Sequence, residues 1–451
     1  MPWFINCKHI AISCLPYRLI ISWATVVILL IYNTEIKAQN MPLTVNDDKS
    51  VTITYVNPVA DEVEIRGDFV KKGNSILPMF SKDGKAKMKN QGDGVWTYTS
   101  APLESDMYLY NFIVDDDSVI YDHSNDNTVR DIATRYNYFI IPGGIGDDLA
   151  DADSKKGSVR YIWYPSTLNG MKKRRMAVYL PYGYMTGKER YPVLYLLHGS
   201  GGDEQAWNEC GRLSRIMDHL IADGRCKPMI VVMPNGNVDL AAAPGQDPDN
   251  PEVQPSANNV SSMFGKVEHV FMHDIVDYID HNYRTVADAR HRAIAGLSLG
   301  GLHALYVALN NPGAFDYLGL FSAQTTNALG DKSIRSLKNL RSRWTELKET
   351  LPFVGGGKVD RKITSITGGT SDAYLDIYEN VDNKIKTLYS NNPRLVYIAV
   401  GRDDFIKKLN DDLRDKLDKG NYPYIYNETS GGHTWTTWRR YLVDFLPRLF
   451  N

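Results

Sequence analysis

Three side chains that are far apart in the sequence form a set able to perform nucleophilic catalysis. Ser298 lies in the stretch AIAGLSLGG, which contains G-x-S-x-G and follows an apolar run. A serine hydroxyl is a poor nucleophile unless a histidine accepts its proton and an acid orients that histidine. His433 in SGGHTWTTW and either Asp403 or Asp404 in VGRDDF supply these groups, in the chain order serine, acid, histidine. The set predicts attack on a carbonyl carbon through a covalent intermediate.

Each of these residues also has a purely structural explanation. A serine between glycines can simply occupy a tight strand-to-helix turn. Asp404 could cap the following helix, because aspartate is a good N-cap, and His433 could cap the last helix. His303 also follows the serine, but it is expected on the helix after the motif, facing away from the site. The other histidines near helices are expected at the surface: His269, His273, His281 and His291.

The same chemistry requires two backbone N–H groups that bind the charge developing on the carbonyl oxygen. One is expected from Leu299, directly after the serine. The other is expected from the glycine-rich loop in YLLHGSGGDEQAW, where its position favours the amide of Ser200. This loop could alternatively be only a tight turn.

Strands alternating with helices, from Ser158 onward, must position these groups. The runs MAVYLP, YPVLYLLHG, PMIVVMP, RAIAG, RLVYIAVG and YPYIYNE are predicted strands. Among the helices between them, VEHVFMHDIVDYIDHNY repeats an apolar residue every four positions, at Val267, Phe271, Ile275 and Ile279. This alternation predicts an α/β fold with a mostly parallel sheet that is covered on both faces.

The preceding residues 43–142 have a different pattern. Short β-branched or aromatic runs such as SVTITYV, EVEIRGDF and YLYNFIVD are separated by turn-rich stretches such as SKDGK and NQGDG. The pattern predicts a small all-β, immunoglobulin-like sandwich. Residues 143–157, rich in glycine and aspartate, are predicted to link it to a second domain at 158–451, and a chain of 451 residues suits two domains.

The N-terminus has the features of an export signal. Lys8 and Arg18 precede an apolar stretch from Leu19 to Tyr32, and a small residue, Ala38, follows. The stretch is shorter than the roughly 20 residues that span a bilayer, which favours a secretory signal over residues 1–38 and a secreted or periplasmic protein. An uncleaved membrane anchor is the alternative.

Cysteine spacing argues against a disulfide, and the overall charge gives no indication of nucleic-acid binding. Cys210 and Cys226 flank a predicted helix of about three turns, so they would lie about 18 Å apart, whereas a disulfide requires less than about 7 Å. Two free, buried thiols are expected. The net charge of −2 gives no electrostatic reason to expect nucleic acid as a partner. Nothing in the sequence indicates a metal or another cofactor.

The motifs YPVLYLLHGSGGDEQAW, KPMIVVMPNG, HRAIAGLSLGG, VGRDDF and SGGHTWTTWRRYL resemble those of carbohydrate esterase family 1. This esterase-D-like group includes feruloyl and acetylxylan esterases. The resemblance covers about residues 157–451 and implies an α/β-hydrolase fold. In the family the acid lies in a G-x-x-D segment, which maps onto Gly401 to Asp404 and favours Asp404 over Asp403. Leu299 stands where methionine is commoner in the family, but only its amide is needed.

The N-terminal runs are similar, more weakly, to the family 48 carbohydrate-binding module. In such tandems the module often serves as packing, so Trp96 is expected in the core and not as a sugar platform. Two further segments differ from the usual pattern. The segment from about residue 325 to 392 is long and is expected to be a solvated amphipathic helix or a lid. The Pro- and Asn-rich loop after PMIVVMP is expected to rim the substrate site, at the carboxyl ends of the strands.

The resemblance implies release of feruloyl or acetyl groups from plant cell-wall polysaccharide such as arabinoxylan. The expected partner is therefore a feruloylated or acetylated glycan, without nucleic acid and without membrane insertion after signal cleavage. A siderophore esterase of the enterochelin type is an alternative, since those enzymes also join a β-sandwich to this hydrolase. A catalytically silent polysaccharide-binding protein is a third possibility. The presence of the serine, the acid, the histidine and the glycine-rich loop together argues against it.

Overall fold

The computed structural model describes residues 42–70, 84–115, 118–151, 155–249, 265–325, 374 and 376–451. The predicted signal and most of the predicted insertion lie outside these residues. Among the helices that are described, none is long and apolar enough to cross a membrane.

The first part of the chain forms two antiparallel sheets. One has the order β1 (Leu43–Val45), β2 (Val51–Val56), β6 (Val95–Thr99), β5 (Lys89–Gly92). The other has the order β4 (Gly84–Lys87), β3 (Val63–Gly67), β7 (Met107–Val114), β10 (Thr134–Ile140), β9 (Thr128–Asp131), with β8 (Ser118–Ile120) beside β7. Buried residues of both sheets share one core, which makes the pair a sandwich. Trp96 is 5% exposed in this core and its indole N–H donates to the Asn57 carbonyl, which confirms the expected packing role.

The second part is built on one eight-stranded sheet. Its order is β11 (Ser158–Pro165), β12 (Lys173–Leu180), β14 (Ile230–Pro234), β13 (Val193–Leu197), β15 (Arg292–Leu297), β16 (Tyr317–Phe321), β17 (Leu395–Gly401), β18 (Ile425–Thr429). The strands from β14 to β18 run parallel, whereas β11 and β12 are antiparallel at one edge. The mostly parallel sheet agrees with the prediction, although the sequence patterns had not identified β11 and β16.

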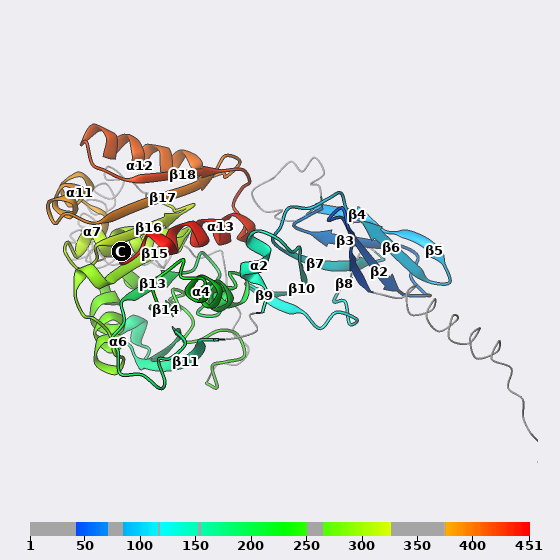
Figure 1. Ribbon diagram of the computed structural model, residues 1–451, viewed down its shortest axis with the longest axis horizontal. Helices are drawn as coiled ribbons and strands as arrows, with labels where there is room; N and C mark the ends of the chain where they lie inside the picture. The colour runs from blue at the N-terminus through cyan, green and yellow to red at the C-terminus, as the bar shows by residue number, and fades with distance from the viewer. Residues whose placement is uncertain are drawn as a thin grey trace, which may run out of the picture.

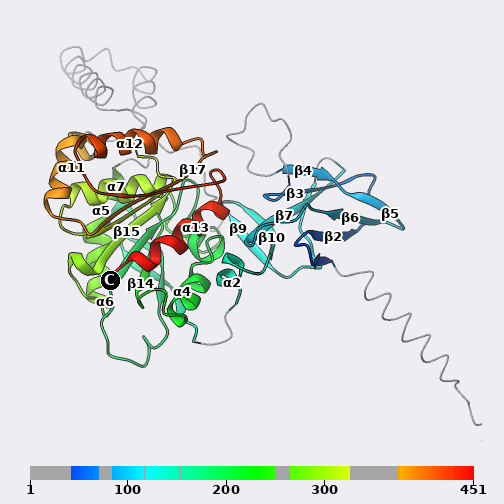
Figure 2. The ribbon, with the colours of Figure 1, turned by 45° about the horizontal axis from the view of Figure 1, so that its top comes forward.

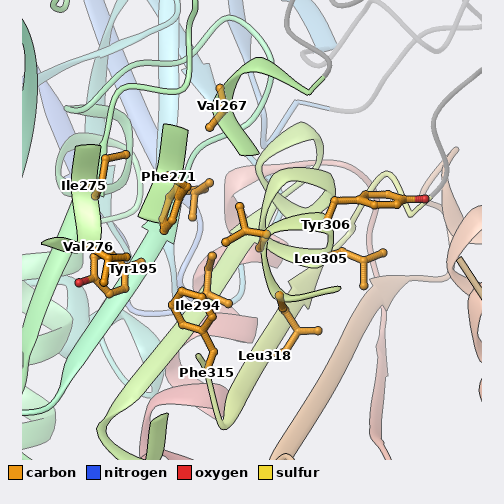
Figure 3. Close-up of a cluster of buried hydrophobic side chains, with 14 of the residues drawn as sticks. Tyr195, Val267, Phe271, Ile275, Val276, Ile294, Leu305, Tyr306, Phe315 and Leu318 are labelled. Carbon is orange, nitrogen blue, oxygen red and sulfur yellow. The ribbon is translucent and has the colours of Figure 1, made fainter. Parts of the chain in front are cut away.

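Helices cover both faces of this sheet, as Figures 1 and 2 show. One face carries α5 (Lys266–Val270), the π-helical η3 (Phe271–Val276), α6 (Asp277–Asn282), α7 (Leu299–Asn310), α11 (Val381–Ser390) and α12 (Lys407–Lys419). The other carries α3 (Ala206–Glu209), α4 (Leu213–Ala222) and α13 (Trp435–Phe445). Figure 3 shows apolar residues of the first group, including Val267, Phe271 and Ile275, packed with strand residues such as Tyr195 and Ile294. The four-residue repeat in the sequence thus becomes a buried face.

The two parts are joined by buried contacts. Strand β7 is buried along its whole length: Tyr108 and Tyr110 enter the sandwich core, while Met107 and Leu109 belong to the core of the α/β part. Within the segment predicted as a linker, α2 (Ile145–Leu149) packs on α4, and the Arg212 side chain donates to the Leu149 carbonyl at 2.9 Å. Part of that segment is therefore packed structure.

The prediction for the cysteines is confirmed. Cys210 and Cys226 are both buried thiols that are not joined in a disulfide. Burial raises the pKa of the Cys226 thiol to about 12, so it remains protonated and unreactive at neutral pH.

Candidate active site

The turn between β15 and α7 presents Ser298 at the carboxyl edge of the sheet. Ser298 has φ 52° and ψ −118°, a strained conformation for a residue with a side chain. The glycines on either side make this turn possible: a Cβ on Gly296 would lie 2.2 Å from the Gly300 carbonyl oxygen, and one on Gly300 would lie 2.3 Å from that of His198. The strand, sharp turn and helix therefore form the elbow that the sequence motif predicts.

The serine, histidine and acid converge on one line of hydrogen bonds. Ser298 Oγ lies 2.9 Å from Nε2 of His433. Nδ1 of His433 lies 3.0 Å from each carboxylate oxygen of Asp404. The three residues follow β15, β17 and β18, which lie with β16 in one consecutive run of parallel strands. The sheet topology thus brings Ser298 within hydrogen-bond distance of His433, which is 135 positions away in the chain.

The two neighbouring aspartates have different environments. The Asp404 side chain is fully buried, and it also accepts a hydrogen bond from the Ile406 amide at 3.1 Å. Asp403 is exposed to solvent. The N-cap of α12 (Lys407–Lys419) is Ile406, without a side-chain cap, so the bond from the Ile406 amide closes the turn before the helix and the capping alternative for Asp404 is wrong.

The glycine-rich loop after β13 runs beside the serine. A Cβ placed on Gly199 would lie 3.2 Å from the Cβ of Ser298. Ser200 follows in this loop, and Leu299 is the first residue of α7, where helix amides have no acceptor within the helix. The two amides predicted to bind a carbonyl oxygen thus lie in segments that flank the serine.

Two buried histidines, His198 and His303, lie near this loop, and no sequence pattern assigns either of them a role in the site. Nε2 of His198 accepts from the Gly236 amide at 2.7 Å, so Nδ1 carries the proton and donates to the Gly199 carbonyl at 2.8 Å. His303 is also buried, and its Nδ1 lies 2.9 Å from Glu268. His303 thus forms a buried pair with Glu268, whereas His433 contacts Ser298 and Asp404, in agreement with the expected exclusion of His303 from the triad.

We expect His198 to make the protein less stable in acid. Burial lowers its pKa to about 4, below the value of about 6.5 in an unfolded chain. As the pH falls, the unfolded chain therefore binds a proton at His198 before the folded chain does. The contribution of His198 to the free energy of unfolding is fully present above about pH 6.5 and falls by about 1.4 kcal/mol per pH unit toward pH 4. Denaturant unfolding across this range should give a shallower pH slope for His198→Gln.

The exposed His281 provides a matched control, because His281→Gln should keep the slope of the unmodified chain. An unchanged slope in His198→Gln would contradict the assignment.

Phe405 is an aromatic residue at the site to which no sequence pattern assigned a role. It follows Asp404 directly, the residue is 55% exposed, and its ring centre lies 4.6 Å from that of His433. The signal in the sequence was an apolar aromatic residue at the solvent end of a buried strand. Among the described residues, no group of three His, Cys, Asp or Glu side chains is arranged to hold a metal ion.

Comparison with known proteins places this geometry in context. Residues 169–449 match the family model described as putative esterase. A protein of Xylanibacter ruminicola named endo-1,4-beta-xylanase/feruloyl esterase is 34% identical over 257 residues, which are 54% of this chain and 32% of that protein. An esterase of Mycobacterium tuberculosis is 27% identical over 306 residues, 64% of this chain and 59% of the relative. The chain thus spans less than two thirds of the length of either relative.

A solved structure extends the likeness to both parts of the chain. The enterobactin esterase of Shigella flexneri covers 92% of this chain, and 97% of its own length is covered. Its TM-score is 0.57 and its sequence identity is 15%, so the likeness is one of fold.

Proposed function

Since the chain belongs to the putative esterase family, we propose that it is a serine carboxylic-ester hydrolase whose catalytic triad is Ser298, His433 and Asp404. The observation that carries the proposal is the continuous hydrogen-bonded line from Ser298 Oγ through the imidazole to a buried carboxylate. Such a line can activate a hydroxyl that is otherwise a weak nucleophile.

Each group has a defined part in the reaction. Ser298 Oγ attacks the ester carbonyl carbon while Nε2 of His433 takes its proton. The resulting oxyanion accepts hydrogen bonds from the amides of Leu299 and Ser200. His433 then protonates the departing alkoxide, which leaves an acyl-enzyme. In the second half of the reaction, His433 takes a proton from water, and the resulting hydroxide attacks the carbonyl carbon of the acyl-enzyme. The bond to Ser298 Oγ breaks, the acid is released, and the proton returns from His433 to Ser298. Asp404 holds the imidazole tautomer and stabilises its positive charge throughout.

We propose feruloyl or acetyl groups on plant cell-wall polysaccharide, such as arabinoxylan, as the substrate. The name of the Xylanibacter relative, which combines a xylanase and a feruloyl esterase, supports this class. An exported enzyme would meet such a polymer, and the predicted signal over residues 1–38 is part of the proposal.

The location of Phe405 suggests which part of the substrate it contacts. His433 must reach the leaving oxygen, so the alcohol of the ester passes beside the imidazole. The exposed ring of Phe405, next to that imidazole, then faces the alcohol and not the acyl group. For a polysaccharide ester the alcohol is a sugar, and its apolar C–H face can pack on an aromatic ring.

Phe405→Ala should therefore change the preference between alcohols. We expect the ratio of kcat/KM for a feruloylated arabinoxylan oligosaccharide to that for methyl ferulate to fall about tenfold, a typical loss for one apolar contact. Steady-state kinetics with both esters measure this ratio. Tyr182 is comparably exposed and follows β12 at the opposite edge of the sheet, so Tyr182→Ala is the control. Equal losses on both esters would refute a contact with the sugar.

The function itself is tested by assaying the chain with methyl ferulate, 4-nitrophenyl acetate, feruloylated arabinoxylan oligosaccharide and enterobactin. Release of ferulate from the oligosaccharide is expected. Activity on acetate alone would move the substrate to acetylated glycans, and preferential opening of enterobactin would favour the siderophore alternative. Absence of turnover on all four would contradict an esterase and favour a silent binding protein.

A further inference from the structure

The hairpin of β9 and β10 reaches from the sandwich to the glycine-rich loop of the candidate active site. Figure 1 shows both strands at the junction of the two parts. The hairpin pairs Asp131 with Thr134, so Ile132 lies in its two-residue turn. A Cβ placed on Gly201 would lie 3.2 to 3.4 Å from three carbon atoms of the Ile132 side chain. The isoleucine therefore packs directly on the loop backbone, one residue after Ser200.

The same hairpin also holds the residues that follow this loop. The Arg130 guanidinium pairs with Asp203 at 2.8 Å and donates to the Gln205 side chain at 2.9 Å. The Arg130 backbone N–H donates to Glu209 at 3.1 Å. The Asp203 side chain is only 1% exposed, so this ion pair is shielded from solvent and more rigid than a surface pair.

A third contact joins the hairpin to the segment that carries the histidine. Trp435 lies two residues after His433, and its indole N–H donates to the Asp131 carboxylate at 3.1 Å. Residues 130–132 of the sandwich thus contact the glycine-rich loop and the start of α13, the helix that directly follows the loop with His433.

The backbone of Ile132 indicates that the contact has a purpose beyond closing the turn. Its φ is 56°, which is strongly unfavourable for a β-branched residue. Glycine or asparagine is the usual choice for a positive φ in a two-residue hairpin. Strain of this kind persists where surrounding structure imposes it, and it concentrates near functional sites. Here the strained residue presents its side chain to Gly201.

We propose that residues 130–132 are positioning residues of the esterase, which fix the glycine-rich loop so that the Ser200 amide points at the oxyanion. The proposal rests on the proposed function and extends it to the sandwich. A loop with glycine at 199, 201 and 202 has large conformational freedom of its own. Oxyanion donors must lie within about 2.7 to 3.1 Å of the developing charge, and a shift of about 1 Å can cost about 100-fold in rate. A rigid external support therefore has a direct effect on catalysis.

The test is Ile132→Gly, which accepts the positive φ and removes the side chain. We expect kcat to fall about tenfold on 4-nitrophenyl acetate and methyl ferulate alike, with KM changed less than about twofold, because a donor to the transition state is misplaced. The Ki of phenylboronic acid, whose tetrahedral adduct needs the same amides, should rise in parallel. The unfolding temperature should stay within about 2 °C, because Ile132 is partly exposed.

Two further variants make the result interpretable. Ile132→Asn also tolerates a positive φ, and it should lose the same rate, because its polar side chain cannot replace the apolar contact. Val59, 85% exposed on the sandwich, provides the control Val59→Gly, which should keep both kcat and the boronate affinity.

Unchanged kcat in both Ile132 variants would overturn the proposal. A raised KM with unchanged kcat and Ki would also overturn it, because Ile132 would then contact substrate without positioning the loop. Ser298→Ala in the same assay separates the two levels. Turnover that survives there refutes the triad, whereas loss there with normal kcat in Ile132→Gly refutes only the role of the hairpin.

Discussion

Ser298→Ala is expected to lower kcat for ester hydrolysis on the order of 10⁶-fold, the scale seen when a triad nucleophile is removed. The hydroxyl is the only group lost, and it is the nucleophile that lies 2.9 Å from Nε2 of His433. The burst of 4-nitrophenol from 4-nitrophenyl acetate and the acyl adduct seen by intact mass spectrometry should both disappear.

Ser322 provides a matched control for this variant. It is also a buried serine that follows a central strand, β16, and it also has a positive φ, of 43°. Ser322→Ala should retain the burst and the adduct. Survival of the adduct in Ser298→Ala would mean that another residue is acylated, and the proposed mechanism would be wrong.

Asp404→Asn is expected to lower kcat about 10⁴-fold, with little change in stability. Both carboxylate oxygens of Asp404 face Nδ1 of His433, so this nitrogen is the proton donor. An amide at 404 can instead donate to Nδ1, which places the proton on Nε2, where it blocks acceptance of the serine proton. The amide oxygen can still accept from the Ile406 amide, which preserves the turn before α12.

Asp403→Asn is the natural comparison, because it makes the same chemical change one residue away in an exposed side chain. Steady-state kinetics on methyl ferulate should show nearly full activity in this variant. Comparable losses in both variants would indicate a general effect of charge and would contradict a specific role for Asp404.

Much of the site was predictable because its signals are local in the sequence. The glycines around Ser298 define the turn, and the strand-end locations of the acid and the histidine follow from the alternation of strands and helices. The choice between Asp403 and Asp404 was not local. Residue patterns left both open, a family resemblance favoured one, and the structure places the Asp404 side chain against His433.

What the sequence did not indicate are the contacts between distant segments. Strand β11 pairs with β12 at an antiparallel edge, and its register depends on a partner and not on its own pattern. The packing of Ile132 on Gly201 joins residues 69 positions apart, and the sequence around neither residue indicates this contact. Strand β7 did carry a signal: apart from Asn111, the run MYLYNFIV is apolar or aromatic without alternation, which is typical of a strand buried on both faces.

The burial of β7 on both faces bears on how this protein can be recombined in evolution or by design. Arg439 of α13 is fully buried, and its guanidinium is bound by Asp106 and by the carbonyls of Met107 and Cys210. Removal of the sandwich would leave the Arg439 charge buried in the α/β part without its carboxylate. An unpaired buried charge destabilises a protein far more than replacement of the whole ion pair does. Transplanting the sandwich onto another enzyme would expose Met107 and Leu109. The sandwich is therefore not an interchangeable module, and the two parts must be inherited together.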